Sequence, residues 1–271
     1  MRHPSARSDG RGHLSGGSAA AAPTGPWLLV GNSRWHWAEA GPDGLSIRHR
    51  PAAEAIQEHR AGPPAVWAAV GRLPADWAAA GPGRVMTGDV PLQAMPAWLG
   101  VDRALAGWLA WCQTGEPVLV ADAGTVLSLT RVDRNGRFAG GRLMAGLSLQ
   151  LRAMAAGTAA LPEAPSPQQF AALMTREVWP QDTAAAMAAG VMQGLAAALA
   201  TALRQCRQDL SGCRLVLTGG DAASLLPLVQ ELHDGCEREL RLEPDLALRG
   251  LVALRPAGGQ EPQARPRSAS T

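Results

Sequence analysis

Three short turns of small residues in this sequence could bind phosphate groups. Each follows a run of apolar residues typical of a buried strand: Gly31-Asn32-Ser33, Asp122-Ala123-Gly124-Thr125 and Thr218-Gly219-Gly220-Asp221. Backbone N–H groups and hydroxyls at such turns can hold phosphate oxygens. One such turn alone is better explained as an ordinary tight turn. Three of them, one bearing Asp122, favour a nucleotide polyphosphate with its cation.

An acid and a base adjoin in Gly100-Val101-Asp102-Arg103, at the start of a predicted helix. In a cleft, Asp102 could accept a proton from a substrate hydroxyl, and Arg103 could hold a carboxylate or phosphate with two hydrogen bonds. Taken alone, the pair is better explained as a helix cap beside a solvent-exposed ion pair.

The composition excludes several classes of enzyme. All 25 basic residues are Arg, so a Walker A loop, the ATP-binding Lys of protein kinases and Schiff-base chemistry are excluded. The histidines outside the first segment (His36, His49, His59 and His233) are scattered and suggest no Ser-His-Asp arrangement. The four cysteines lack Cys-x-x-Cys spacing and are expected to be free thiols in a reducing cytoplasm.

The charge balance argues against a polyanionic partner. The net charge is +2, and the polar segments 1–25 and 257–271, which we expect to be disordered tails, carry most of the positive charge. The remainder is close to neutral, so we expect no nucleic-acid or anionic-membrane partner. The first residues contain no apolar stretch typical of a signal peptide, which favours a cytoplasmic protein.

One uncharged stretch, from Thr183 to Leu203, is about as long as a membrane span. It is mostly Ala and Gly, and larger apolar residues recur in it every fourth position, from Met187 to Leu203. This spacing predicts a long helix buried along one face, with Asp182 as its N-cap, and no transmembrane segment.

The elements that must position these residues form two similar halves, residues 26–115 and 116–256. We expect strands at Trp27–Val30, Arg34–Glu39, Leu45–His49, Ala65–Val70, Arg84–Thr87, Pro117–Ala121, Val126–Val132, Arg137–Met144, Arg214–Leu217 and Glu239–Leu242. We expect helices at Ala52–Arg60, Asp76–Ala80, Asp102–Cys112, 146–155, 168–177, 182–207, Asp221–Leu232 and Leu246–Leu254. Each half begins with an apolar strand, a small-residue turn and a hairpin, which predicts two related α/β subdomains facing each other across a cleft.

The order of the motifs resembles the type III pantothenate kinases. The resemblance comprises Gly31-Asn32-Ser33, Gly100-Val101-Asp102-Arg103, Asp122-Ala123-Gly124-Thr125, Gly140-Gly141 with Gly146, Leu161-Pro162, Thr183 and Thr218-Gly219-Gly220-Asp221. It implies duplicated ribonuclease-H-like (actin-like ATPase) subdomains around a nucleotide cleft. It also implies a cytoplasmic homodimer that phosphorylates pantothenate to 4'-phosphopantothenate with ATP, the first step of coenzyme A biosynthesis.

The same resemblance assigns roles to individual residues. Asp102 is the expected catalytic base, and Gly100, Val101 and Arg103 line the pantothenate site with it. Thr183 is expected to reach pantothenate from the neighbouring subunit. Asp122 is the expected ligand of a monovalent cation, potassium or ammonium. MgATP is expected to contact Gly31, Asn32, Ser33, Arg34, Thr125, Gly219 and Gly220.

The sequence departs from the family pattern at several positions. Leu29 stands where the first turn usually has an Asp that would help to place magnesium, Ser33 replaces Thr, and Ala145 replaces Pro. The substrate-pocket Tyr is absent, and Trp98 is nearby. These departures leave open a regulatory protein that binds nucleotide or pantothenate without catalysis. A kinase acting on a sugar or acetate is a third hypothesis.

Overall fold

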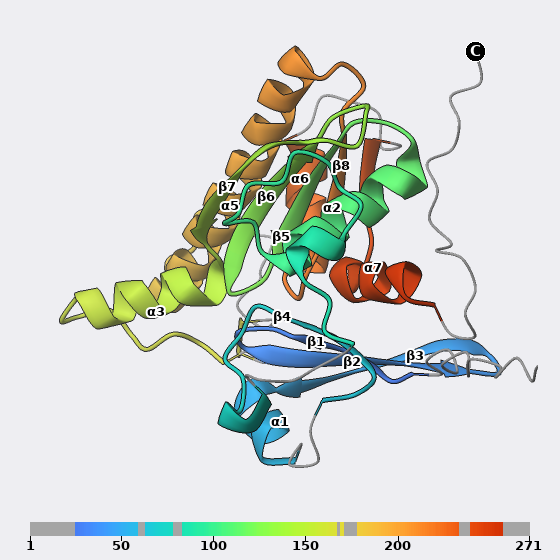
Figure 1. Ribbon diagram of the computed structural model, residues 1–271. Helices are drawn as coiled ribbons and strands as arrows, with labels where there is room; N and C mark the ends of the chain where they lie inside the picture. The colour runs from blue at the N-terminus through green and yellow to red at the C-terminus, as the bar shows by residue number, and fades with distance from the viewer. Residues whose placement is uncertain are drawn as a thin grey trace, which may run out of the picture.

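The computed structural model describes residues 25–58, 63–77, 83–166, 169–170, 178–232 and 239–256. The tails predicted at 1–25 and 257–271 lie outside these ranges, apart from Gly25. The chain forms two β-sheets with helices between them and on their outer faces (Figure 1).

The first sheet has the strand order β3-β2-β1-β4. Its strands are β1 (Trp27–Val30), β2 (Arg34–Gly41), β3 (Gly44–Pro51) and β4 (Val66–Ala69). β1, β2 and β3 are antiparallel neighbours, whereas β4 runs parallel to β1. Four buried tryptophans, Trp35, Trp37, Trp67 and Trp77, form a cluster with residues of α1 (Ala52–Glu58) on one face.

The second sheet repeats this order as β7-β6-β5-β8 and adds β9 at the edge. Its strands are β5 (Val118–Ala123), β6 (Val126–Val132), β7 (Phe138–Ala145), β8 (Arg214–Thr218) and β9 (Leu240–Leu242). β5, β6 and β7 are antiparallel neighbours, and β8 runs parallel to β5, as β4 does to β1. The predicted α/β fold with a duplicated, ribonuclease-H-like unit is therefore confirmed.

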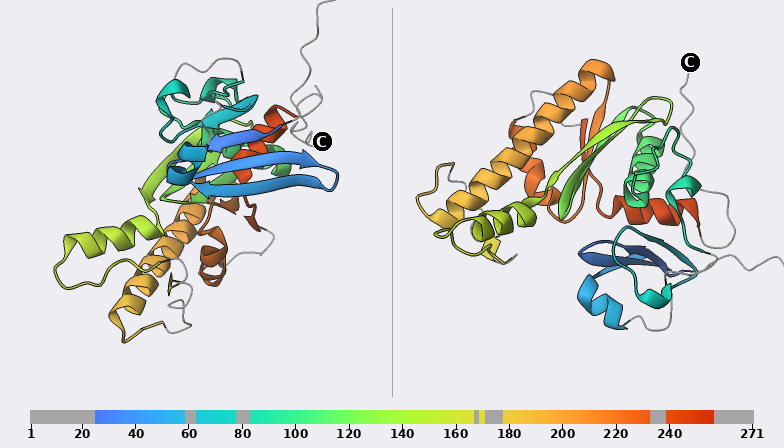
Figure 2. Two further views of the ribbon diagram at one scale, coloured as in Figure 1. Left: turned by 90° about the horizontal axis from the view of Figure 1, so that it is seen from below. Right: turned by 60° about the vertical axis from the view of Figure 1, so that its left-hand side comes forward.

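Two helices fill the space between the sheets, α2 (Val101–Thr114) and α7 (Leu246–Leu254) (Figure 2, right). One hydrophobic cluster joins Leu29 of the first sheet, Leu105 of α2, Leu251 of α7 and Val120 of the second sheet. The helices cross closely at Gly250, where a Cβ atom would lie 2.7 Å from the Leu105 carbonyl oxygen. The start of α2, with the predicted acid–base pair, is thus held between the sheets.

The outer face of the second sheet is covered by α3 (Leu147–Gly157), α5 (Thr183–Asp209) and α6 (Ala222–Glu231). Among the described residues, α5 is long and apolar enough to cross a membrane, but 56% of its most apolar window is buried inside the protein. The predicted stripe from Met187 to Leu203 packs against the sheet. The Asp182 carboxylate accepts a hydrogen bond from the Ala185 N–H at 2.9 Å. The predictions of a core helix and of its N-cap are confirmed.

The strand predicted at Arg84–Thr87 is wrong. Only a single bridge pairs Arg84 with Trp67, and a 3-10 helix, η2 (Thr87–Asp89), follows. The chain leaves the sheet because the Thr87 hydroxyl donates to the Leu99 carbonyl oxygen and the Asp89 carboxylate accepts from the Met86 N–H. Of the helix predicted at Asp76–Ala80, the described part is the 3-10 helix η1 (Ala75–Trp77). The helix predicted at 168–177 lies almost entirely outside the described residues.

Candidate active site

The three glycine-containing turns lie together in the folded chain. The hydroxyls of Ser33, after β1, and Thr125, after β5, share a hydrogen bond across the two sheets. The Arg34 guanidinium lies near the third turn, since a Cβ atom on Gly220 would be 3.7 Å from its Nη1 atom. Burial raises the pKa of Asp221, and the charge of Arg34 partly opposes this rise. Most of the residues predicted to contact a nucleotide are therefore brought to one place.

Two of these turns require glycine for steric reasons. A Cβ atom on Gly31 would lie 2.6 Å from the Arg34 carbonyl oxygen, which accepts a hydrogen bond from the Gly31 N–H. Gly219 has a φ of +91°, and a Cβ atom there would lie 2.5 Å from Asp122 Oδ1. Glycine at these positions lets the backbone approach the carboxylate and any bound phosphate closely.

Asp122 lies near the end of β5 with an unusual environment for a carboxylate. Burial, and next the charge of the nearby Asp102, raise its pKa to about 6. Among the residues that the structure describes, no ion pair or hydrogen bond reaches the Asp122 side chain. A carboxylate that is largely removed from solvent and has no counter-charge is costly unless it is protonated or coordinates a cation. The position therefore fits a cation ligand.

Asp102 is the second residue of α2, and its Oδ1 atom accepts a hydrogen bond from the Arg103 N–H at 2.8 Å. Burial raises the pKa of Asp102, while the Arg103 N–H and guanidinium act in the opposite direction. Gly100 precedes the carboxylate so closely that a Cβ atom there would lie 2.6 Å from Oδ1. A carboxylate with a raised pKa is a stronger proton acceptor than an exposed one.

Arg103 is buried, with 9% of its surface exposed, and connects α2 to the second sheet. Its Nε donates to Thr130 Oγ1 at 3.1 Å and its Nη2 to the Leu129 carbonyl oxygen at 3.2 Å. The guanidinium also lies over the Trp98 ring, 5.6 Å from its centroid. Two of the nitrogens with which Arg103 was expected to bind a ligand, Nε and Nη2, therefore already donate hydrogen bonds within the protein. Thr130, an inward-facing residue of β6, was not identified from the sequence.

Gly141 makes room for this guanidinium, so its replacement tests the packing. A Cβ atom at Gly141 would lie 2.5 Å from Arg103 Nη2 and would overlap the Leu129 carbonyl oxygen. We expect Gly141→Ala to lower the free energy of unfolding by about 1–3 kcal/mol, measured by urea denaturation. Gly157→Ala is the control, because nothing lies within 4 Å of a Cβ there. Equal stability of the two variants would contradict this role.

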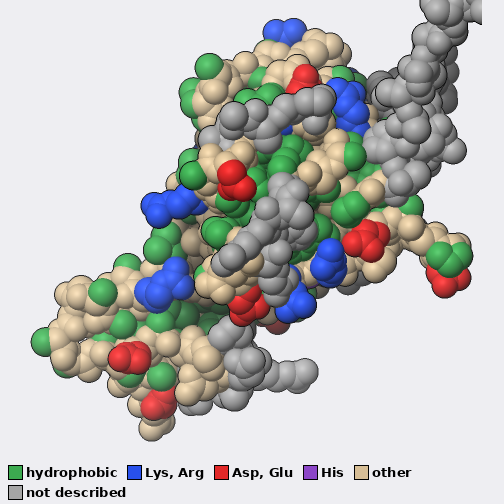
Figure 3. All heavy atoms as spheres, turned by 60° about the horizontal axis from the view of Figure 1, so that its bottom comes forward, with side chains coloured by type: hydrophobic (Ala, Val, Ile, Leu, Met, Phe, Trp, Pro, Cys, Tyr) green, Lys and Arg blue, Asp and Glu red, His purple; other side chains and the backbone are tan. Residues whose placement is uncertain are grey.

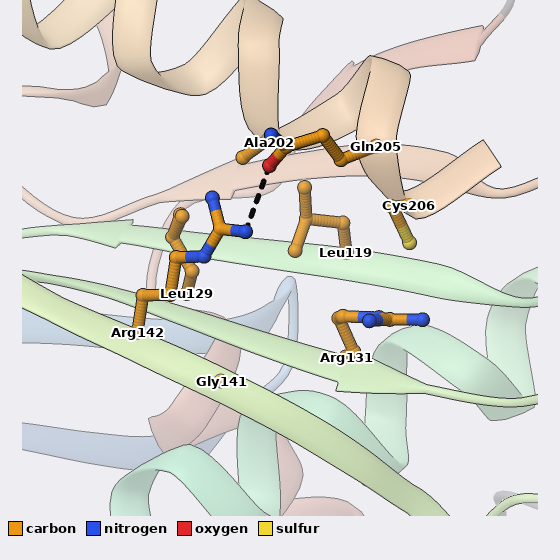
Figure 4. A pocket seen from close by; sticks show the side chains of 8 residues that line it. All are labelled: Leu119, Leu129, Arg131, Gly141, Arg142, Ala202, Gln205 and Cys206. Atoms are coloured by element: carbon orange, nitrogen blue, oxygen red, sulfur yellow. Dashed lines mark hydrogen bonds between the residues drawn. The ribbon is translucent and has the colours of Figure 1, made fainter. Parts of the chain in front are cut away.

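A cavity of about 140 Å³ opens beside the start of α2. It is lined by Ala69, Val70, Val85, Met86, Thr87, Gly100 and Val101, which include two of the predicted substrate residues. The sequence pattern does not single out Met86 and Thr87, because it predicts a strand over Arg84–Thr87. A second cavity of about 100 Å³ lies between β5–β7 and α5, where Arg142 Nη2 donates to Gln205 Oε1 at 2.7 Å (Figure 4). It contains none of the predicted site residues.

Within one chain, Thr183 does not reach the site, and Leu29 contributes no polar group to it. Thr183 is exposed in the first turn of α5, and its hydroxyl makes no hydrogen bond with the described residues around Asp102. Leu29 is buried in β1, between His36 of β2 and Ala68 of β4. It occupies the position in the first sheet that corresponds to Asp122 in the second. Of these two corresponding positions, only the one in β5 carries a carboxylate.

Comparison with known proteins identifies one family. Residues 79–205 match the family model described as type III pantothenate kinase. A type III pantothenate kinase of Synechococcus elongatus is 35% identical, covering 87% of this chain and 98% of that protein. The protein of the same name from Thermosynechococcus vestitus is 34% identical, over 86% of this chain and 91% of that protein. Similarity to these relatives extends well beyond the short motifs.

Proposed function

This chain belongs to the type III pantothenate kinase family, and we propose how its residues carry out the phosphorylation of pantothenate to 4'-phosphopantothenate in coenzyme A biosynthesis. The observation that carries the proposal is the meeting of the two sheets at the Ser33–Thr125 hydrogen bond. It supports the proposal because the glycine-containing turns then lie beside Asp122, which is near enough to Asp102 for the two charges to interact.

Asp102 is the proposed base. In phosphoryl transfer the enzyme mainly positions the reactants and neutralises charge, while a carboxylate accepts the proton of the attacking hydroxyl. Asp102 stands at the start of α2 beside the cavity at Gly100 and Val101, where the hydroxyl end of pantothenate would bind. The hydrogens on Nη1 of Arg103, which make no hydrogen bond within the described residues, are free for the substrate.

The turns are the proposed ATP site. The backbone N–H groups of Gly31-Asn32-Ser33 and Gly219-Gly220, the Ser33 and Thr125 hydroxyls and the Arg34 guanidinium offer donors to phosphate oxygens. Gly219 and Gly220 also precede α6, whose N-terminus favours negative charge.

Asp122 is the proposed ligand of the monovalent cation, potassium or ammonium. The cation would supply positive charge beside the transferring phosphoryl group. Because Leu29 provides no carboxylate in the first turn, the magnesium of MgATP would be held by the phosphates and water.

Replacing Asp122 tests the cation role with two readouts. Ionised Asp122 opposes folding above its pKa of about 6, so Asp122→Asn should raise the free energy of unfolding at neutral pH by about 1–3 kcal/mol in cation-free buffer. Potassium should raise both the melting temperature and the turnover of the wild type. It should raise neither quantity in the variant. Equal wild-type turnover in potassium and sodium would exclude the role. The exposed variant Asp43→Asn serves as the control.

The reaction itself is tested by following ATP consumption with pantothenate, with a panel of sugars and with acetate. We expect consumption with pantothenate alone, and a product heavier than pantothenate by one phosphoryl group in mass spectrometry. Consumption with a sugar or acetate instead would indicate a different kinase. Nucleotide binding without consumption would indicate a regulatory protein.

A homodimer is the proposed assembly, with Thr183 completing the partner's pantothenate site. Val178 and Trp179, which precede α5, are 65% and 86% exposed. Gly190 and Gly194 have nothing within 4 Å of a Cβ position, so a second helix could approach α5 closely. On the projecting arm of α3 and the start of α5, at the lower left of Figure 3, charged side chains are scattered among small and apolar ones. The exposed Val178 and Trp179 supply the apolar area that such an association would bury.

The proposed location of this activity is the cytoplasm. Cys206 and Cys213 are buried thiols, as expected for a reducing compartment, while Cys236 lies outside the described residues.

A further inference from the structure

Two histidines and an aspartate that the kinase reaction does not use form a cluster beside the site. His36 of β2 and His49 of β3 are direct cross-strand partners, and Asp245 precedes α7. The two Nδ1 atoms are 2.8 Å apart, and His49 Nε2 lies 3.6 Å from Asp245 Oδ1. We propose that His36, His49 and Asp245 bind one transition-metal ion of the Zn²⁺ type.

The spacing suits such an ion after small side-chain rotations. One ligand atom from each residue lies within 4.8 Å of the others. Tetrahedral Zn²⁺ with bonds of about 2.0 Å needs ligand atoms about 3.3 Å apart. His49 is 41% exposed at its side chain and can rotate toward the ion, whereas the pairing of β2 with β3 fixes the two histidine backbones.

The environment of His36 favours the neutral imidazole that a metal ligand needs. Burial, and next the proximity of His49, lower the pKa of His36 to about 4, so its imidazole is neutral at physiological pH. Asp245 and Arg34 are the other charges that act on it, in opposite directions. A neutral imidazole has a lone pair to donate, and an ion bound to both Nδ1 atoms would require each ring to carry its proton on Nε2.

The Asp245 side chain is positioned as a metal ligand rather than as a cap of α7. It occupies the N-cap position of α7, but its side chain makes no capping hydrogen bond. Its φ is +57°, a left-handed conformation that non-glycine residues rarely adopt. The carboxylate is turned toward His49 instead. The start of α7 therefore lacks a side-chain cap, and a metal contact would offset this loss of stability.

The donor set indicates the chemical class of the ion and its effect. Two imidazole nitrogens and one carboxylate suit Zn²⁺, Co²⁺ or Ni²⁺ better than Mg²⁺ or K⁺, and leave a fourth position for water. His36 and His49 belong to the first sheet, whereas the residue after Asp245 donates its N–H to Thr218 of the second. The ion would therefore connect the two sheets next to Gly31, whose Cβ position is 3.7 Å from His36 Nε2.

The test uses untagged full-length protein freed of metal by a chelator and studied without nucleotide. Calorimetric titration with Zn²⁺ should show one site per chain that His49→Ala and Asp245→Asn each weaken by at least about tenfold. Co²⁺ should give a visible absorption band that both variants lose. Zn²⁺ should raise the melting temperature of the wild type and of the control Asp76→Asn, but not of His49→Ala.

The N-terminal His3 and His13 provide the second control. A variant with both changed to Ala should keep the tight site. Unchanged Zn²⁺ affinity in His49→Ala, or loss of the site in the His3/His13 variant, would overturn the proposal. Circular dichroism establishes that each variant is folded. Turnover is not a readout, so the outcome is independent of the proposed kinase roles.

Discussion

Asp102→Asn should leave the protein folded and able to bind ATP, but should lower kcat by about 10²–10⁴-fold. The carboxylate is the proposed proton acceptor of the pantothenate hydroxyl. Asparagine retains an oxygen that can accept the Arg103 N–H, so the start of α2 should keep its structure. The measurement is ADP release with saturating pantothenate, together with nucleotide binding by calorimetry.

The matched control for this variant is Asp43→Asn in the exposed turn between β2 and β3, which should retain full activity. The wild-type rate should fall as the pH decreases through the pKa of Asp102, because the protonated acid accepts no proton. Since burial raises this pKa, the fall should begin at a higher pH than for an exposed aspartate. More than about a third of wild-type turnover in Asp102→Asn would exclude the role of general base.

The second large effect is expected on mixing two inactive proteins. Asp102→Asn and Thr183→Arg should each be inactive alone if Thr183 completes the site of the partner subunit. After subunit exchange, a heterodimer contains one site with both substitutions and one with neither. Half of the dimers in an equal mixture are heterodimers, so about a quarter of wild-type activity should return. Activity is measured before and after exchange.

The controls separate a shared site from damage to α5. Asp182, and not Thr183, caps the helix, so Thr183→Arg should leave its start intact. Thr183→Ser retains the hydroxyl and should remain active. Light scattering should report about twice 28.2 kDa. A fully active monomer, or no recovery despite demonstrated subunit exchange, would contradict the shared site.

Much of the fold could be predicted because local patterns determine it. The apolar runs of β1 and β5, the Asn135-Gly136 turn and the four-residue spacing in α5 each depend on neighbouring residues. The repetition of the same pattern in both halves then indicated two similar sheets, which the strand orders confirm. The turns that meet at Ser33 and Thr125 follow from that symmetry.

Contacts between distant residues could not be predicted from the pattern. The sequence shows Arg103 only as a helix residue beside an acid. In the folded chain its side chain is buried and donates a hydrogen bond to Thr130, 27 positions away. His36 and His49 look scattered until the β2–β3 register pairs them and the α7 start adds Asp245. The segment after Arg84 resembles a strand, but side-chain hydrogen bonds from Thr87 and Asp89 turn it away.

The position of α7 has a consequence for how the protein is made. This helix is the last described element of the chain, but it packs against α2 and against β1, the first strand. The Trp27 indole N–H donates to the Arg255 carbonyl oxygen at 2.7 Å, which joins the two ends of the described chain. During synthesis, the first sheet therefore emerges from the ribosome with one apolar face uncovered. The helix α2 then packs against β4, and the part of this face at β1 and β2 stays uncovered until residues 246–254 follow. The first half completes its core only after the second half has been translated.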